Sequence, residues 1–130
     1  PILETHGFQA KLQIPIKTTG NELSLAEVVS VSQAMNITVL YEYIESVYRQ
    51  TNEMITHLTY QELKRTFTLT DAQTLRASSV VSPDERSAWL VNYWCSKDVK
   101  GLLKMPFSRH WIMHIEAANR IADKIKLKNT

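Results

Sequence analysis

Residues 24–58 read SLAEVVSVSQAMNITVLYEYIESVYRQTNEMITHL, and this stretch decides the fold class. Ser24 and Glu27 have the spacing of a capping box, in which each side chain accepts a hydrogen bond from a free backbone N–H group of the first turn. Apolar residues then recur at steps of three and four, which places most of them on one side of a helix. They are Leu25, Val28, Val29, Met35, Val39, Leu40, Tyr43, Ile44, Val47, Met54 and Leu58. The pattern predicts one long helix over residues 24–58, with its weakest point at Asn36.

The residues that follow this helix predict a short helix and then a connection. Thr59 and Glu62 form a second capping box, which predicts a short helix through Arg65. Residues 67–81 have no clear periodicity beyond a turn begun at Thr70 and Asp71. We therefore expect residues 67–81 to cross the molecule without regular structure, although such long connections are uncommon in compact domains.

Two further helices are predicted in the C-terminal part of the chain. The run Ser82-Pro83-Asp84-Glu85 combines an N-cap serine, a proline at the first helical position and an early glutamate. The helix that it starts is expected to bend or break between Cys95 and Gly101. Pro106 then opens a last helix that extends to about Lys126.

Residues 8–16 have a different period from the rest of the chain. Phe8, Ala10, Leu12, Ile14 and Ile16 alternate with polar residues or proline, as in a strand. The proline at position 15 confines such a segment to an edge strand or an extended arm, and a single segment does not support a sheet. We predict an extended arm over residues 1–22 that packs on helices.

The composition is typical of one globular domain. The chain has 130 residues, of which 44% are hydrophobic and 22% charged. Together with the helical patterns, this predicts a single all-α domain of residues 1–130, an up-down type helical bundle. Its parts are an extended arm (1–22), a long helix plus a short helix (23–66) and C-terminal helices (82–127).

The same counts argue against several function classes. No apolar run approaches the length of a membrane span, and Cys95 has no partner for a disulfide, which favours a cytoplasmic setting. A net charge of +2 does not argue for nucleic acid as a partner. The three glycines are isolated, so no glycine-rich phosphate loop is present.

His110 and His114 form the constellation with the strongest chemical signal. Four residues apart on a helix, their imidazoles share one face and can converge on one metal ion. The helical wheel places His114 at the centre of a stripe formed by Phe107, Trp111, Ala118, Ile121 and Ile125, which we expect to be buried. The alternative is a pair of histidines at the edge of the core that are satisfied by hydrogen bonds. His57 and His6 are the candidates for a third ligand.

Other side chains near this helix admit two interpretations each. The aromatic residues Trp89, Tyr93, Trp94 and Trp111 are candidates for a ligand pocket, and also fit an aromatic core at helical spacing. Cys95 is expected to be a buried, inert thiol. A basic stripe of Lys97, Lys100 and Lys104 is expected to face solvent, with phosphate contact as the alternative.

The run Leu102–Ala117, LLKMPFSRHWIMHIEA, resembles the C-terminal part of the DinB-like (damage-inducible) metal-dependent four-helix-bundle proteins. The run SLAEVV at residues 24–29, the long helix after it and the turn over residues 58–63 resemble the same family. The resemblance implies that His110 and His114 bind a divalent metal ion (Ni, Zn or Mn), with a third histidine from an earlier helix. That third histidine has no match in this chain.

There are two hypotheses about function, and the first of them is what the resemblance implies. Enzymes of this family include hydrolases and thiol transferases, in which the metal lowers the pKa of a bound water or thiol. The other hypothesis is a non-catalytic helical module that binds a small ligand or a protein partner, with structural histidines. The chain begins at Pro1, so we expect either that an initiator methionine was removed or that an N-terminal piece is missing. Because wide apolar stripes leave a face uncovered, we expect a homodimer.

Overall fold

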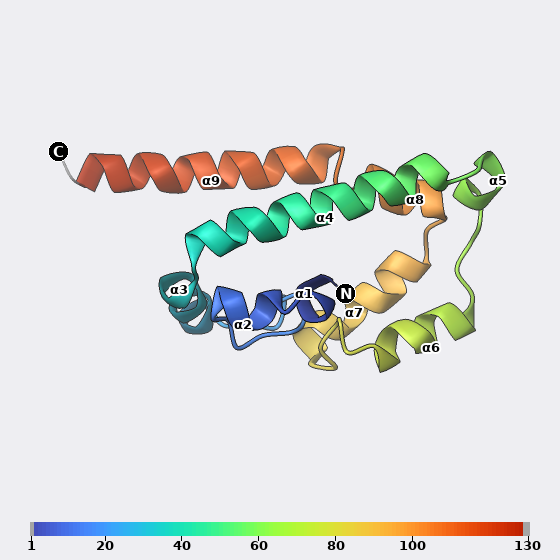
Figure 1. The fold of residues 1–130 in the computed structure, drawn as a ribbon, viewed down its shortest axis with the longest axis horizontal. Coiled ribbons are helices and arrows are strands. Elements are labelled where there is room, and N and C mark those ends of the chain that lie inside the picture. The colour runs from blue at the N-terminus through green and yellow to red at the C-terminus, as the bar shows by residue number, and fades with distance from the viewer. Residues whose placement is uncertain (1, 129–130) are drawn as a thin grey trace.

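The structure is a computed structural model that describes residues 2–128, without the side chain of Arg109. Pro1, on which the expectation of a missing N-terminal piece depended, lies outside the described residues. Over residues 2–128 the chain is all-α, with nine helices and no strand, which confirms the predicted fold class (Figure 1). Within the same residues, one isolated backbone bridge joins Thr66 to Asp98.

The helices follow one another along the whole described chain. In order they are α1 (Ile2–Thr5), α2 (Phe8–Leu12), α3 (Leu25–Ala34), α4 (Ile37–His57), α5 (Tyr60–Leu63), α6 (Leu69–Ala77), α7 (Glu85–Cys95), α8 (Val99–Lys104) and α9 (Arg109–Lys128). None of the described helices of 18 residues or more is apolar enough to cross a membrane.

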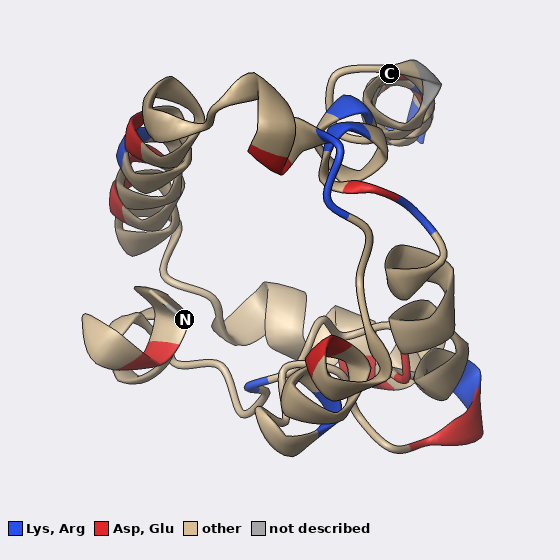
Figure 2. Cartoon of the chain, turned by 90° about the vertical axis from the view of Figure 1, so that its right-hand side faces the viewer, with Lys and Arg blue, Asp and Glu red and all other residues tan. Residues whose placement is uncertain are grey.

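Two separate apolar clusters join α1 and α2 to α4, and α6 to α7. In the first, the buried residues Ile2, Phe8 and Leu12 of α1 and α2 pack against one side of α4. In the second, Ala72 of α6 packs with Val81, Leu90 and Val91 around α7. Figure 2, which looks along the long axis of Figure 1, shows α4 and α9 at separate corners of the molecule.

The predicted extended arm is helical in its first half. Phe8 and Leu12 were read as alternate positions of a strand, but a spacing of four also suits one face of a helix. Both are buried against α4, and this packing decides for α2. Gln13, with φ 59°, ends α2, and the chain from Ile14 to Leu23 contains no helix or strand.

The predicted long helix is two helices, because the chain is extended at Met35 and Asn36. The capping box of Ser24 and Glu27 starts α3 as predicted. The Asn36 side chain accepts a hydrogen bond from the N–H of Val39 (3.3 Å) and so starts α4. The Asn36 N–H donates to the Leu12 carbonyl (3.3 Å), which fixes the break against the end of α2.

The connection over residues 67–81 was wrongly predicted to lack structure. Thr68 and Asp71 form a capping box that starts α6. Only Ala72 of this helix is fully buried, so its sequence lacks the apolar period by which a helix is recognised. The short helix after Thr59 is confirmed as α5, again with its capping box.

The C-terminal helices begin later than predicted. The N-cap of α7 is Asp84 rather than Ser82, whose hydroxyl instead accepts a hydrogen bond from the Asp84 N–H (3.2 Å). The predicted break between Cys95 and Gly101 is confirmed, since α7 ends at Cys95 and α8 begins at Val99. Residues 105–108 form a turn, so α9 begins after the predicted position at Pro106.

Candidate functional site

The imidazoles of His110 and His114 face each other on the first turns of α9. Their Nε2 atoms lie 2.7 Å apart, and their ring centroids lie 4.6 Å apart at an interplanar angle of 44°. A spacing of four residues on a helix produces this neighbourhood. With one Nε2 protonated and the other free, the pair forms one hydrogen bond.

The predicted burial of this helix is wrong. Both histidines are exposed, and so is the apolar stripe that was expected to be buried beside them. Its members Phe107, Trp111, Ile121 and Ile125 all count among the exposed large hydrophobic residues. A helical wheel identifies an apolar face, but burial also requires a second element, and within residues 2–128 none covers α9.

Both histidines open onto a pocket of about 730 Å³ that lies between α7 and the start of α9. Three of the four predicted pocket aromatics, Trp89, Tyr93 and Trp94, line the same pocket. The fourth, Trp111, is exposed and is not part of its wall. The remaining wall consists of Thr19, Asn21, Leu90, Met105 and Pro106.

The aromatic wall is held in place by contacts within α7 and its end. The Trp89 and Tyr93 rings form an edge-on pair with centroids 5.7 Å apart. Trp89 Nε1 donates to the Arg86 carbonyl (3.0 Å), and the Lys97 ammonium lies 4.1 Å from the Tyr93 ring centroid. Leu90 is buried in the cluster between α6 and α7 and so anchors the helix that carries these rings.

Thr19 and Asn21 are wall residues that the sequence did not indicate. The Thr19 N–H donates to the Val80 carbonyl (2.9 Å), and the Asn21 side-chain amide donates to the Thr19 hydroxyl (2.9 Å). Thr19 thus ties the segment after α2 to the segment before α7. No motif carried this information, because the contact joins residues that are far apart in the sequence.

The candidates for a third metal ligand lie elsewhere. His57 Nδ1 is 2.7 Å from the Glu53 carbonyl at the end of α4, and the His6 ring packs edge-on to Phe8 on α2. Among the described residues, no group of three or more His, Cys, Asp or Glu side chains is placed to hold a metal ion. The histidine pair therefore offers two candidate ligands.

These two ligands fit a divalent metal ion in position and chemistry. Two nitrogens bound at 2.0–2.1 Å to a tetrahedral zinc are separated by about 3.3 Å. The observed 2.7 Å between the Nε2 atoms reaches that value through small rotations of exposed side chains. A neutral imidazole is also a common ligand of zinc and nickel.

A tight ion pair marks the N-terminus of α7, the helix of the aromatic wall. The Arg86 guanidinium donates to both carboxylate oxygens of Asp84, at 2.9 and 2.8 Å. This side-chain pair, together with the Arg86 N–H, lowers the pKa of Asp84 from 3.8 to about 2. The same ion pair raises the pKa of Arg86.

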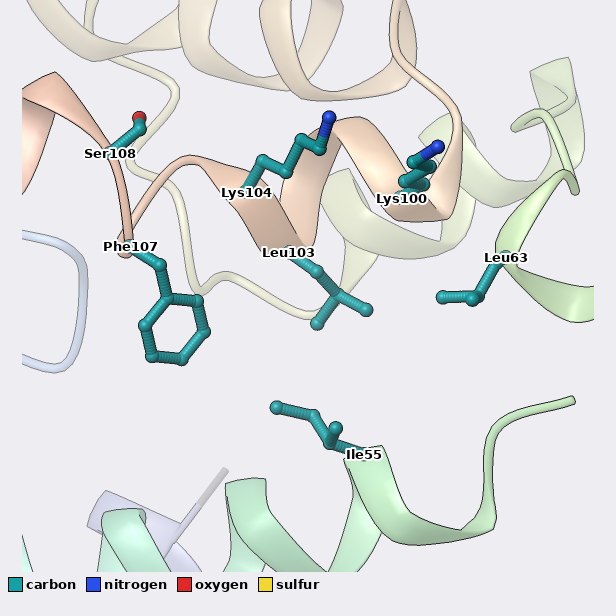
Figure 3. A pocket seen from close by; sticks show the side chains of 7 residues that line it. All are labelled: Ile55, Leu63, Lys100, Leu103, Lys104, Phe107 and Ser108. Carbon is teal, nitrogen blue, oxygen red and sulfur yellow. The ribbon is translucent and has the colours of Figure 1, made fainter. Parts of the chain in front are cut away.

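The remaining residues singled out from the sequence lie on other cavities. Cys95 is half-buried and lines a cavity of about 440 Å³ with Phe67, Trp94 and Leu102. Lys100 and Lys104 border an apolar groove of about 480 Å³ between the end of α4 and α8 (Figure 3). Lys97 packs on Tyr93 instead, so the three lysines of the predicted stripe do not form one site.

Comparison with known proteins assigns the chain to no family. No protein-family model matches the chain, and neither a curated protein nor a solved structure matches it.

Proposed function

We propose that this chain is a metal-binding protein of the DinB-like kind, in which His110 and His114 bind one divalent ion. The observation that carries the proposal is the 2.7 Å approach of the two Nε2 atoms at the edge of an aromatic-walled pocket. Exposed imidazoles gain little from bonding to each other rather than to water. A metal ion bound by both nitrogens would account for their close approach.

The proposed chemistry is metal-dependent hydrolysis or thiol transfer in the cytoplasm. A bound divalent ion would supply Lewis acidity and lower the pKa of a coordinated water or thiol. His110 and His114 hold the ion at the start of α9. Trp89, Tyr93 and Trp94 form a wall that excludes water from one side of a bound substrate and packs on its apolar part.

The second candidate function is a non-catalytic helical module. The observation that favours it is the absence, within residues 2–128, of a third ligand beside the pair. In that case the pocket binds an apolar small ligand, or the exposed helices bind a protein partner, and the histidines bond to each other. Under both candidates we expect a homodimer.

Metal analysis of the purified chain separates the two candidates. The protein is prepared without chelator, and bound Ni, Zn and Mn are measured for the parent chain, for His114→Ala and for His57→Ala. We expect close to one ion per chain in the parent and in His57→Ala, and none above trace in His114→Ala. Only trace metal in the parent chain, after each ion has been offered in turn, would overturn the metal-binding proposal.

A further inference from the structure

The apolar side of α9 has no covering element among the described residues. Trp111, Ile121 and Ile125 are 61%, 60% and 56% exposed. Ile112, Met113, Ile115 and Leu127 on the same helix are also exposed. A 20-residue helix with this many bare apolar side chains loses the packing that stabilises amphipathic helices. Exposed apolar surface of this extent marks an interaction site.

A second uncovered stripe runs along α4. One side of α4, with Val39, Tyr43 and Val47, packs on α1 and α2. A neighbouring side carries Ile37, Tyr41, Ile44 and Tyr48 at steps of four, three and four, and all four side chains are exposed. This spacing is the seam pattern of helices that pair along their length.

The two stripes lie on helices that are aligned along the molecule (Figure 1). Figure 2 shows α4 and α9 apart, and Figure 1 shows that they run along the same long axis in opposite directions. At the end of α4, Ile55 faces Leu103 and Phe107 across an apolar groove (Figure 3). A neighbouring cavity of about 490 Å³ continues this apolar lining with Met54 and Leu58.

Helices α4 and α9 are similar in length and carry complementary charges. They have 21 and 20 residues, about 30 Å each. The charged residues of α4 are mostly acidic: three glutamates, Glu42, Glu45 and Glu53, and one arginine, Arg49. The C-terminal half of α9 carries Arg120, Lys124, Lys126 and Lys128 against a single aspartate. Glu45 is paired with Arg49 (3.2 Å), so the remaining charges favour an α9 that lies beside α4 with its C-terminal half near Glu42.

We propose that α9 of one copy packs along the uncovered stripe of α4 of a second copy, and that a twofold axis repeats this contact. Each chain then covers both uncovered stripes of its partner, and the four helices form a closed bundle. The inference rests on the homodimer of the proposed function and names the two helices that form its interface. His114 belongs to the same stripe of α9, but Ile121 lies seven residues further along the helix and the α4 stripe contains no histidine, so the contact and the metal can be tested separately.

The first test compares two glutamate substitutions on opposite sides of α9. Light scattering over a hundredfold dilution is expected to give a dimer for the parent chain and for Asn119→Glu, which adds the same charge on the polar side. Ile121→Glu is expected to weaken the dimer by at least about tenfold, because it buries a charge in the contact. Circular dichroism confirms that helix content is kept. A parent chain that stays monomeric, or an Ile121→Glu dimer of unchanged affinity, would overturn the proposal.

The second test identifies which helices touch. In a Cys95→Ser background, Tyr41→Cys and Ile121→Cys are prepared as separate proteins and treated with a short bismaleimide. We expect cross-linked dimer mainly in the mixture of the two. Dimer in the Ile121→Cys protein alone would show α9 packed on α9. A chain that carries both Tyr41→Cys and Ile121→Cys serves as a further sample. If it cross-links only within single chains, α9 closes on its own α4. Either of these two results rejects the proposed contact. Metal content of Ile121→Glu is measured in parallel, so loss of the dimer and loss of the metal site remain separate outcomes.

Discussion

The Nε2 atoms of His110 and His114 lie 2.7 Å apart, although neither side chain is buried. This contact places two imidazole nitrogens, the metal ligands of our proposal, in the pocket that Trp89 and Trp94 also line. We therefore predict that Ni²⁺ quenches part of the tryptophan fluorescence. His114→Ala should weaken the apparent affinity by more than tenfold, or over about 1.4 kcal/mol, because a single imidazole remains.

His57→Ala is the matched control for this titration. His57 is an exposed histidine at the C-terminal end of α4 whose Nδ1 lies near the Glu53 carbonyl rather than beside His110 or His114, so its removal should leave the Ni²⁺ titration unchanged. Equal weakening by both substitutions would mean that quenching reports surface histidines in general.

The features that could be predicted best from the sequence are those that depend on residues close together along the chain. The capping boxes at Ser24 and Thr59 start helices as expected, and the break after Cys95 lies between the predicted positions. The helix period also placed His110 and His114 on one side of α9. Local hydrogen bonds and helix geometry suffice for these predictions, since they depend on spacings of three and four residues.

What depends on distant partners could not be predicted. Phe8 and Leu12 fit a strand or a helix, and only their burial against α4 chooses between the two. Thr19 reaches the pocket through a hydrogen bond to Val80 that no local pattern signals. The stripe of Trp111 and Ile121 is amphipathic as predicted, yet exposed, because amphipathicity does not supply the element that would cover it.

Asn36 separates α3 from α4, and its side chain caps α4 through the Val39 N–H. We predict that Asn36→Ala destabilises the chain by about 1 kcal/mol, because alanine leaves that donor without a partner. Asn36→Asp should be close to the parent chain, since aspartate is an equally good cap. The urea midpoint by circular dichroism measures both. A neutral Asn36→Ala would mean that the bond to the Leu12 carbonyl alone holds the break.

Leu12 is 1% exposed, whereas Leu69, the first residue of α6, is 85% exposed. The same substitution at the two positions should therefore have different effects. Leu12→Ala is expected to cost about 2.7 to 5 kcal/mol, because it opens a cavity between α2 and α4. Leu69→Ala should change stability by less than about 0.5 kcal/mol. Urea unfolding measures both differences, and similar costs at the two positions would contradict the separate cluster formed by α1, α2 and α4.

Asp84 links the stability of α7 to pH. Its carboxylate accepts hydrogen bonds from the Arg86 guanidinium and N–H, which lower its pKa from 3.8 to about 2. A lowered pKa in the folded state means that the charged form is stabilised, so this contribution is complete above about pH 4 and is lost as the pH falls toward 2.

Asp84→Asn keeps a capping side chain but removes the charge. We expect the parent chain to be more stable than the variant at neutral pH, and the difference in urea midpoint to shrink between about pH 4 and pH 2. The carboxylates of Glu62 and Asp71, whose pKa values are also lowered, do not interact with Asp84 and cancel in the comparison. The pKa of Glu27 is lowered mainly by its hydrogen bonds with Ser24, which both proteins keep. A difference that stays constant over this range would show that the Asp84–Arg86 pair does not stabilise the start of α7.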